Sequence, residues 1–139
     1  MTKTFGQRGV CRAALIAAAM LVLSAGASLA ADFDLTGNWV HVDTGDTASI
    51  RQVGDDVWWV ARSADGGKSW THVFHGKLDG HKLTGHFADL PEGKSRNQGS
   101  YRGKVFLKDN GNVLEVDVEL RFSPDNNTWK GHAKYKRAD

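Results

Sequence analysis

The sequence predicts an all-β protein, an eight-stranded up-and-down antiparallel barrel that follows an N-terminal signal peptide. Short apolar runs separated by turn residues recur roughly every 8–12 residues after residue 30, which is typical of a β-sandwich or barrel. The same region shows almost no helical periodicity and contains many glycines. Strands joined by short hairpins form a meander with two open edges, and closure into a barrel removes both.

Residues 1–30 are typical of a secretory signal peptide. A basic start precedes an apolar segment at 13–30 that ends in small residues. The segment is short for a membrane span, so we expect cleavage after residue 30 or 31, no membrane insertion afterwards, and a periplasmic or secreted protein. Residues 31–139 then form a single domain, and the one cysteine, Cys11, is removed with the signal.

Charge gives no reason to expect a nucleic-acid partner. The chain has 18 basic and 16 acidic residues, but three basic ones, Lys3, Arg8 and Arg12, lie in the signal peptide, and no acidic one does. The remaining domain therefore carries 15 basic and 16 acidic side chains, a net charge of −1. Nucleic-acid binding is usually marked by a basic domain with a basic patch.

The bounds of the eight predicted strands follow from where turn residues interrupt the apolar runs. They cover residues 34–42, 47–53, 56–63, 70–78, 81–88, 99–108, 112–122 and 128–137. Asp-Gly and Asn-Gly pairs between them supply the positive φ that tight hairpins need. Alternation is clearest in the seventh strand, where Leu114, Val116, Val118 and Leu120 face one side and charged residues face the other.

The same alternation assigns most aromatic residues to the barrel interior. The side chains expected to point inward are Trp39, His41, Trp59, Trp70, His72, Phe74, His81, Leu83, Phe87, Tyr101, Val105, Trp129 and Tyr135. Those expected on the solvated outer face are Arg62, Lys77, Lys82, Arg102, Lys104, Lys130 and Lys134. Trp58 breaks the alternation, and we expect it to mark either a β-bulge or a surface patch.

Residues 63–70, SADGGKSW, match the Ser-x-Asp-x-Gly-x-x-Trp pattern of the Asp-box and so resemble the blade hairpins of sialidases. A propeller requires several four-stranded blades, and glycoside hydrolysis usually requires a placed pair of carboxylates, neither of which this sequence offers. The pattern suits a turn, in which Asp65 accepts backbone N–H groups, Gly66 and Gly67 adopt unusual φ, and Trp70 packs beneath. We expect a structural hairpin and no enzyme.

The stretch LTGNW, residues 35–39, resembles the Gly-x-Trp signature of the calycins, the group of lipocalin, avidin and related barrels. This resemblance implies that Trp39 closes one end of the barrel. It also implies that a basic residue of the last strand, Lys134, Lys136 or Arg137, packs across the indole as a cation–π contact.

Two departures separate the sequence from the avidins. His41 stands where avidins have a biotin-binding Asn, and Gly45-Asp46 replaces their Gly-Ser pair, although TWKG at 128–131 is similar to an avidin strand. The resemblance therefore implies the barrel and not biotin binding. Residues 63–76 and 85–93 also resemble a group of small exported bacterial proteins of unassigned function, which brings no chemistry with it.

An eight-stranded barrel is just wide enough to be filled by side chains or to hold one small ligand. We expect a small apolar or aromatic ligand, because ligand sites are mostly apolar and aromatic with a few convergent polar groups. The expected lining is Trp39, His41, Trp59, Trp70, His72, Phe74, Phe87, Tyr101 and Trp129. A polar end of the ligand would be oriented by His72, Tyr101 or His41.

The alternative is a barrel with a filled interior that binds a protein, as an enzyme inhibitor or an envelope accessory factor. Its contact surface would be the polar loop at 91–99 or the surface around Trp58. No catalytic residue, cofactor or metal site is expected, because the sequence contains no nucleophile motif and no phosphate-binding loop. His72 and His75 are three apart in one strand and face opposite sides, so a metal would need histidines of different strands to converge.

Overall fold

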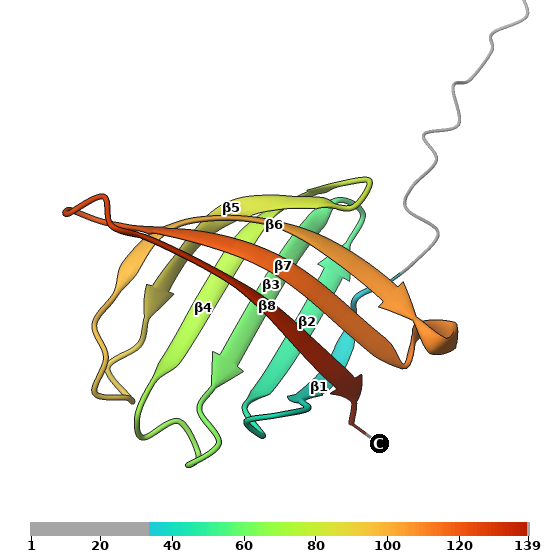
Figure 1. The fold of residues 1–139 in the computed structure, drawn as a ribbon, viewed down its shortest axis with the longest axis horizontal. Coiled ribbons are helices and arrows are strands. Elements are labelled where there is room, and N and C mark those ends of the chain that lie inside the picture. Colours follow the sequence, from blue (N-terminus) through green and yellow to red (C-terminus); the bar gives the residue numbers. More distant parts are fainter. Residues whose placement is uncertain (1–33, 139) are drawn as a thin grey trace, which may run out of the picture.

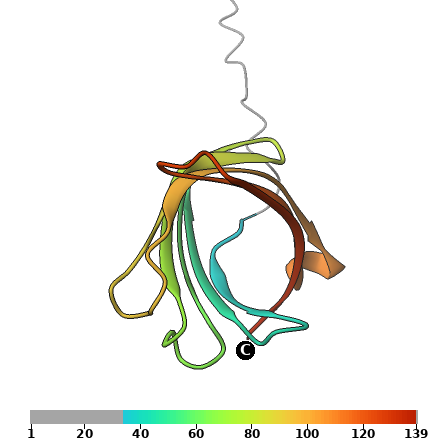
Figure 2. The ribbon, with the colours of Figure 1, turned by 60° about the vertical axis from the view of Figure 1, so that its left-hand side comes forward.

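A computed structural model describes residues 34–138, so the signal peptide predicted at 1–30 and its cleavage site lie outside the described part. The strands are β1 (Gly37–His41), β2 (Thr47–Val53), β3 (Asp56–Arg62), β4 (Thr71–Asp79), β5 (Lys82–Asp89), β6 (Gln98–Lys108), β7 (Val113–Phe122) and β8 (Thr128–Arg137). A short 3₁₀ helix, η1 (Asp109–Gly111), joins β6 to β7. The strands pair in chain order and β1 also pairs with β8, which closes an up-and-down antiparallel barrel (Figures 1 and 2). The predicted fold class is confirmed.

The turn residues predicted the strand ends closely. β2 and β8 have the predicted bounds, and most other ends differ by one residue. The largest difference is at the start of β1, which begins at Gly37 rather than at residue 34. Here the chain packs inside the barrel before the strand begins: Leu35 is fully buried, and its N–H donates to Gln52 Oε1 at 3.0 Å.

Because successive strands alternate in direction, the connections divide between two ends of the barrel. The longer loops lie at one end, which we call the open end, and comprise residues 42–46, 63–70, 90–97 and 123–127. The tight turns lie at the other, the closed end, and comprise residues 54–55, 80–81 and the segment with η1. In Figure 1 the open-end loops are on the left and at the bottom, and η1 is on the right.

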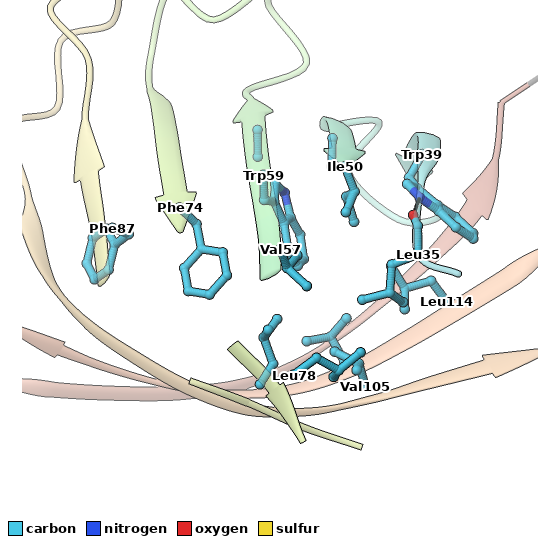
Figure 3. Close-up of a cluster of buried hydrophobic side chains, with 14 residues drawn as sticks. Leu35, Trp39, Ile50, Val57, Trp59, Phe74, Leu78, Phe87, Val105 and Leu114 are labelled. Atoms are coloured by element: carbon cyan, nitrogen blue, oxygen red, sulfur yellow. Dashed lines mark hydrogen bonds between the residues drawn. The ribbon is translucent and has the colours of Figure 1, made fainter. Parts of the chain in front are cut away.

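The closed end is filled by apolar side chains. Those no more than 1% exposed are Leu35, Trp39, Val57, Leu83, Val105 and Leu114. Figure 3 shows Val105 and Leu114 grouped near Leu35 and the indole of Trp39. Burial of an aliphatic or aromatic side chain of this size stabilises a fold by roughly 1.5–3 kcal/mol, so this group is a main source of stability.

Trp39 is held by segments from both ends of the described chain. Its Nε1 donates to the carbonyl of Leu35 at 3.0 Å, and the guanidinium carbon of Arg137 lies 4.2 Å from the centre of the indole. Arg137 also donates to the carbonyls of Thr36 (2.7 Å, from Nη1) and Gly111 (3.0 Å, from Nε). Of the three basic residues that could have packed across Trp39, Arg137 does so.

Gly37 makes this arrangement possible. Its φ is +150°, and a Cβ at this position would lie 2.2 Å from Nη1 of Arg137. Any larger residue would push the guanidinium off the indole of Trp39. The Gly-x-Trp stretch therefore has a steric reason here, since the glycine leaves the space through which the arginine reaches the tryptophan two residues later.

Glycines on the inner face leave room for rings to lie along the barrel wall. Gly76 and Gly85 pair across β4 and β5, and a Cβ on either would come within 2.4 or 2.7 Å of the Phe74 ring. Tyr101 lies over Gly103 in the same way, with Oη 3.1 Å from the position of a Cβ. Side chains at these glycines would displace both rings toward the middle of the barrel.

The side chains predicted on the outer face lie there, and one side chain predicted on the inner face, that of His81, does not point inward. All the basic side chains assigned to it are exposed, and Trp58 is 44% exposed and stacks on His75 with ring centres 5.0 Å apart. The strand register is unbroken through Trp58, so it marks a surface patch and not a bulge. The inward placement of His81 was wrong: it is exposed in the β4–β5 turn, where it stacks on Phe106, because a turn interrupts the alternation.

Candidate functional site

A cavity of about 540 Å³ lies inside the barrel at the open end. Its apolar wall includes Trp59, Trp70, Phe74, Phe87, Tyr101, Val116, Val118, Leu120, Phe122, Trp129, Ala133 and Tyr135. Its polar lining residues are His41, Thr44, Asp46, His72, Asp89, Ser95, Asn97 and His132. Aromatic rings thus form much of the surface that a molecule inside the cavity would meet.

All but one of the residues predicted to line a site surround the cavity. The structure brings together around the cavity His41, Trp59, Trp70, His72, Phe74, Phe87, Tyr101 and Trp129. Trp39 does not line it, because this inward residue packs at the closed end against Leu35 and Arg137. Trp129 lies at the mouth and is 50% exposed.

Trp59 lies at the boundary between the cavity and the packed core, since it belongs to both. Its ring makes edge contacts with Phe74 and Tyr135 at centre distances of 6.4 and 6.1 Å. Tyr101 lies 6.3 Å from it and 4.8 Å from Phe74. Figure 3 shows Trp59, Phe74 and Phe87 side by side on β3, β4 and β5. These contacts fix the rings and give the cavity a defined shape.

Two buried polar atoms in this cluster, Trp59 Nε1 and Tyr101 Oη, have no hydrogen-bond partner among residues 34–138. An unpaired buried polar group costs about 1–3 kcal/mol of stability. Burial raises the pKa of the Tyr101 phenol above its ordinary value and, together with the charge of Asp46, raises the pKa of Tyr135 to about 12. Both phenols are therefore protonated at neutral pH.

Three histidines line the cavity: His132 pairs through Nδ1 with Asp117 at 2.8 Å, and the other two have different surroundings. His72 is largely buried and stacks on Trp70 with ring centres 5.1 Å apart. Burial lowers the pKa of His72 below its ordinary value, although the carboxylate of Asp89 opposes the shift, so the ring is neutral at neutral pH. His41 Nδ1 accepts the N–H groups of Asp43 and Thr44, both at 3.2 Å, so a neutral His41 carries its proton on Nε2.

The Asp-box forms part of the rim as the β3–β4 connection. Asp65 accepts from Ser63 Oγ (2.5 Å), Ser69 Oγ (2.6 Å) and Ser69 N (3.2 Å), which holds the pKa of its carboxyl far below the ordinary value. Gly66 and Gly67 have φ of 78° and 87°, as the turn interpretation requires. Their N–H groups both donate to the carbonyl of Ser63 at 3.1 Å. The ring of Trp70, which ends the pattern, lies on the cavity side.

The polar loop predicted at 91–99 lies beside the Asp-box at the open end. The N–H groups of Lys94 and Ser95 donate to the carbonyl of Ser69 at 3.0 and 3.1 Å. A Cβ on Gly93 would lie 2.6 Å from the Cα of Trp70, so only glycine permits this close approach. The two loops therefore form one hydrogen-bonded unit at the cavity mouth.

Sequence reasoning omitted several residues that line the cavity. Asp89 is two residues after Phe87 on the same face of β5, so the alternation that found Phe87 could also have found Asp89. Tyr135 lies on the predicted inward face of β8, so alternation indicates it as a lining residue too. Asp46 and Ser95 come from loops, where no periodicity indicates which way a side chain points.

The cavity differs in charge from the outer face. Among residues 34–138 no lysine or arginine lines it, whereas the carboxylates of Asp46 and Asp89 do. Basic side chains gather in a hollow of about 490 Å³ over the outer face of β4–β7, which includes Lys77, Arg102 and Arg121. These three cations lie on the other side of the barrel wall from the cavity.

Two kinds of feature are absent from residues 34–138. Within 34–138, His, Asp and Glu side chains form no group of three or more that could hold a metal ion. The same part of the chain contains no helix of the length and apolarity needed to cross a membrane.

The fold and the cavity together define the class of structure: an up-and-down β-barrel with one packed and one hollow end. The sequence matches no family model, and no curated protein matches it significantly.

Proposed function

We propose that the protein is an exported, calycin-like barrel that binds a small apolar or aromatic molecule in the open-end cavity and catalyses no reaction. The observation that carries this proposal is the cavity of about 540 Å³ walled by aromatic rings. Small-molecule sites are typically concave and apolar, with volumes of about 300–1,000 Å³ and a few polar groups. Filling the cavity with such a molecule would remove apolar surface from water, which is the main source of affinity.

The calycin part of the proposal is supported by Gly37, Trp39 and Arg137. A basic residue of the last strand packed across Trp39 is the arrangement that the resemblance of LTGNW implies, and Gly37 leaves room for it. Biotin is not proposed as the ligand, because His41 replaces the avidin Asn at a position that lines the cavity.

Polar groups around the cavity would orient the ligand. His72 and His41 both line the cavity, and the neutral imidazole of His72 can donate from one nitrogen and accept at the other. Tyr101 Oη, which lacks a partner within residues 34–138, would gain one from a polar atom of a ligand placed beside it. Few polar contacts of this kind fix the position of a mainly apolar ligand.

Native mass spectrometry of the processed protein, purified from its own host and compared with its denatured mass, tests the proposal. We expect extra mass that disappears on denaturation. Ala133→Trp would fill the cavity from β8 and abolish the extra mass, whereas Lys134→Trp places the same ring on the next, outward-facing residue and should retain it. A bare polypeptide mass, or extra mass that persists in a folded Ala133→Trp variant, contradicts the proposal.

A bare mass would favour the second candidate, a protein-binding barrel. The observation that supports it is the exposed indole of Trp58 stacked on His75. Such a barrel could act as an enzyme inhibitor or an envelope accessory factor, through this surface or loop 91–99. Substitution of Trp58 by Ala should then abolish capture of a partner that binds this surface, whereas a partner of loop 91–99 should still be captured.

A further inference from the structure

The charges around the cavity restrict the kind of ligand that it can accept, provided that the proposed binding function is correct. Asp46 and Asp89 face the cavity, and no lysine or arginine among residues 34–138 does. His72 does not offset these charges, because burial keeps its imidazole neutral at neutral pH. Apart from histidines, the ionisable side chains with a formal charge at neutral pH that line the cavity within residues 34–138 are therefore both acidic, which disfavours an anionic ligand.

Asp89 is the carboxylate best placed to meet a ligand. Its Oδ2 accepts from Ser95 Oγ (2.5 Å) and from the N–H of Asn97 (2.7 Å), which fixes the side chain. Its Oδ1 has no hydrogen bond and no ion pair with any residue of 34–138. The carboxylate is thus oriented by one oxygen, and the other oxygen remains available to a donor or a cation.

Aromatic rings line the same part of the cavity as this carboxylate and pack against its strand partner, His72. Asp89 pairs directly with His72 across β4 and β5, and His72 lies between Trp70 (5.1 Å) and Phe87 (6.1 Å between ring centres). The faces of tryptophan and phenylalanine rings attract cations through their quadrupoles, and cages of such rings are a known means of binding amines and quaternary ammonium groups. A carboxylate beside aromatic rings favours a positive group with apolar substituents.

Asp46 adds a second negative charge to the same cavity. Its Oδ1 accepts from the N–H of Ala64 at 2.8 Å and its Oδ2 from Thr44 Oγ at 2.7 Å. No basic side chain among residues 34–138 pairs with it. Two uncompensated carboxylates make the cavity selective by charge as well as by shape.

We propose that the ligand is an organic cation, with an apolar or aromatic body among the rings of the cavity and an amine or quaternary ammonium group beside Asp89 Oδ1 and Trp70. The apolar body supplies affinity, and the positive group supplies orientation and selectivity against acids of the same shape.

Three probes of nearly equal shape test this assignment on the processed protein: naphthylmethylamine is a cation, ethylnaphthalene is neutral and naphthoate is an anion. Equilibrium affinities are measured at neutral pH for the wild type and for Asp89→Asn, which retains an oxygen for Ser95 and Asn97. We expect Asp89→Asn to weaken the amine about tenfold, to leave ethylnaphthalene unchanged and to strengthen naphthoate. Asp79→Asn, which removes an exposed carboxylate at the closed end, is the matched control and should change none of the three affinities.

The outcomes separate this inference from the binding function on which it rests. If no probe binds, or if binding survives in a folded Ala133→Trp variant, the binding function itself is overturned. If all three probes bind in the cavity and Asp89→Asn alters none of them, only the cationic assignment fails. Tighter wild-type binding of naphthoate than of the amine also overturns that assignment and leaves the cavity as a binding site.

Discussion

The two ends of the barrel are built from the same eight strands, yet one is packed and the other is hollow. At the closed end Leu35 enters the barrel, Trp39 covers the interior and Arg137 covers Trp39. At the open end the strands are joined by longer loops, and the inward side chains are rings that surround a cavity of about 540 Å³. The packed side chains of the closed end therefore stabilise the fold, and the inward side chains of the open end are free to vary with a ligand.

Substitution of Trp39 by Ala should lower the free energy of unfolding more than any other change considered, and it tests directly whether the closed end stabilises the fold. Loss of a fully buried tryptophan typically costs about 3–5 kcal/mol, because the surrounding structure collapses only partly into the space. Urea denaturation measures the change, with Trp129→Ala at the cavity mouth as the matched control. We expect less than about 1 kcal/mol for Trp129, which is half exposed. Equal losses in the two variants would contradict a stabilising role confined to the closed end.

Replacement of Arg137 by Lys should have the next largest effect. Lysine keeps the charge but loses the planar group that stacks on Trp39 and donates to the carbonyls of Thr36 and Gly111. We expect a loss of about 1–3 kcal/mol, measured by thermal and urea unfolding. The neighbouring, exposed Lys136 provides the control, and its replacement by Ala should be nearly neutral. A neutral Arg137→Lys variant would show that the stacked guanidinium contributes little.

Substitution of Tyr101 by Phe should raise the stability of the barrel and weaken its binding of a ligand. It removes a buried hydroxyl without a partner among residues 34–138, so we expect the free energy of unfolding to rise by about 1 kcal/mol. If Tyr101 orients a ligand, the same variant should bind more weakly. Urea denaturation and a binding titration on the same sample measure both. A loss of stability would show that the hydroxyl has a partner when the protein is in solution.

The smallest expected effect is a dependence of stability on pH through His72. Its pKa in the folded protein is lowered below the ordinary value of 6.5, so the unfolded chain binds a proton first as the pH falls. The contribution of His72 is therefore complete above pH 6.5 and decreases as the pH falls from there toward the folded pKa.

Unfolding curves recorded on both sides of pH 6.5 measure this contribution. His72→Gln should flatten the acid loss of stability, whereas substitution of the exposed His86 by Gln should leave it in place. An unchanged slope in His72→Gln would show that protonation of other groups causes the loss.

Much of the candidate site was predictable from the sequence. Period-two alternation correctly placed Trp59, Phe74, Phe87 and Tyr101 on the inner face, since a strand side chain can only point in or out. Loop side chains such as Asp46 have no such constraint. Their positions depend on hydrogen bonds between loops that are distant in sequence, such as the bond from Ala64 N to Asp46 Oδ1.

The sequence by itself determined the all-β barrel, the strand bounds and the face on which each strand residue lies, because these depend on local turn chemistry and alternation. The tertiary structure decided the height of each residue along the barrel. Paired residues lead from Trp39 through Ala48, Ala61 and His72 to Asp89, so one row joins the closed end to the rim of the cavity. Strands in a barrel tilt against its axis, and this stagger is a property of the whole sheet that no single strand encodes. For that reason Trp39 closes the barrel, while Asp89 in the same row faces the cavity.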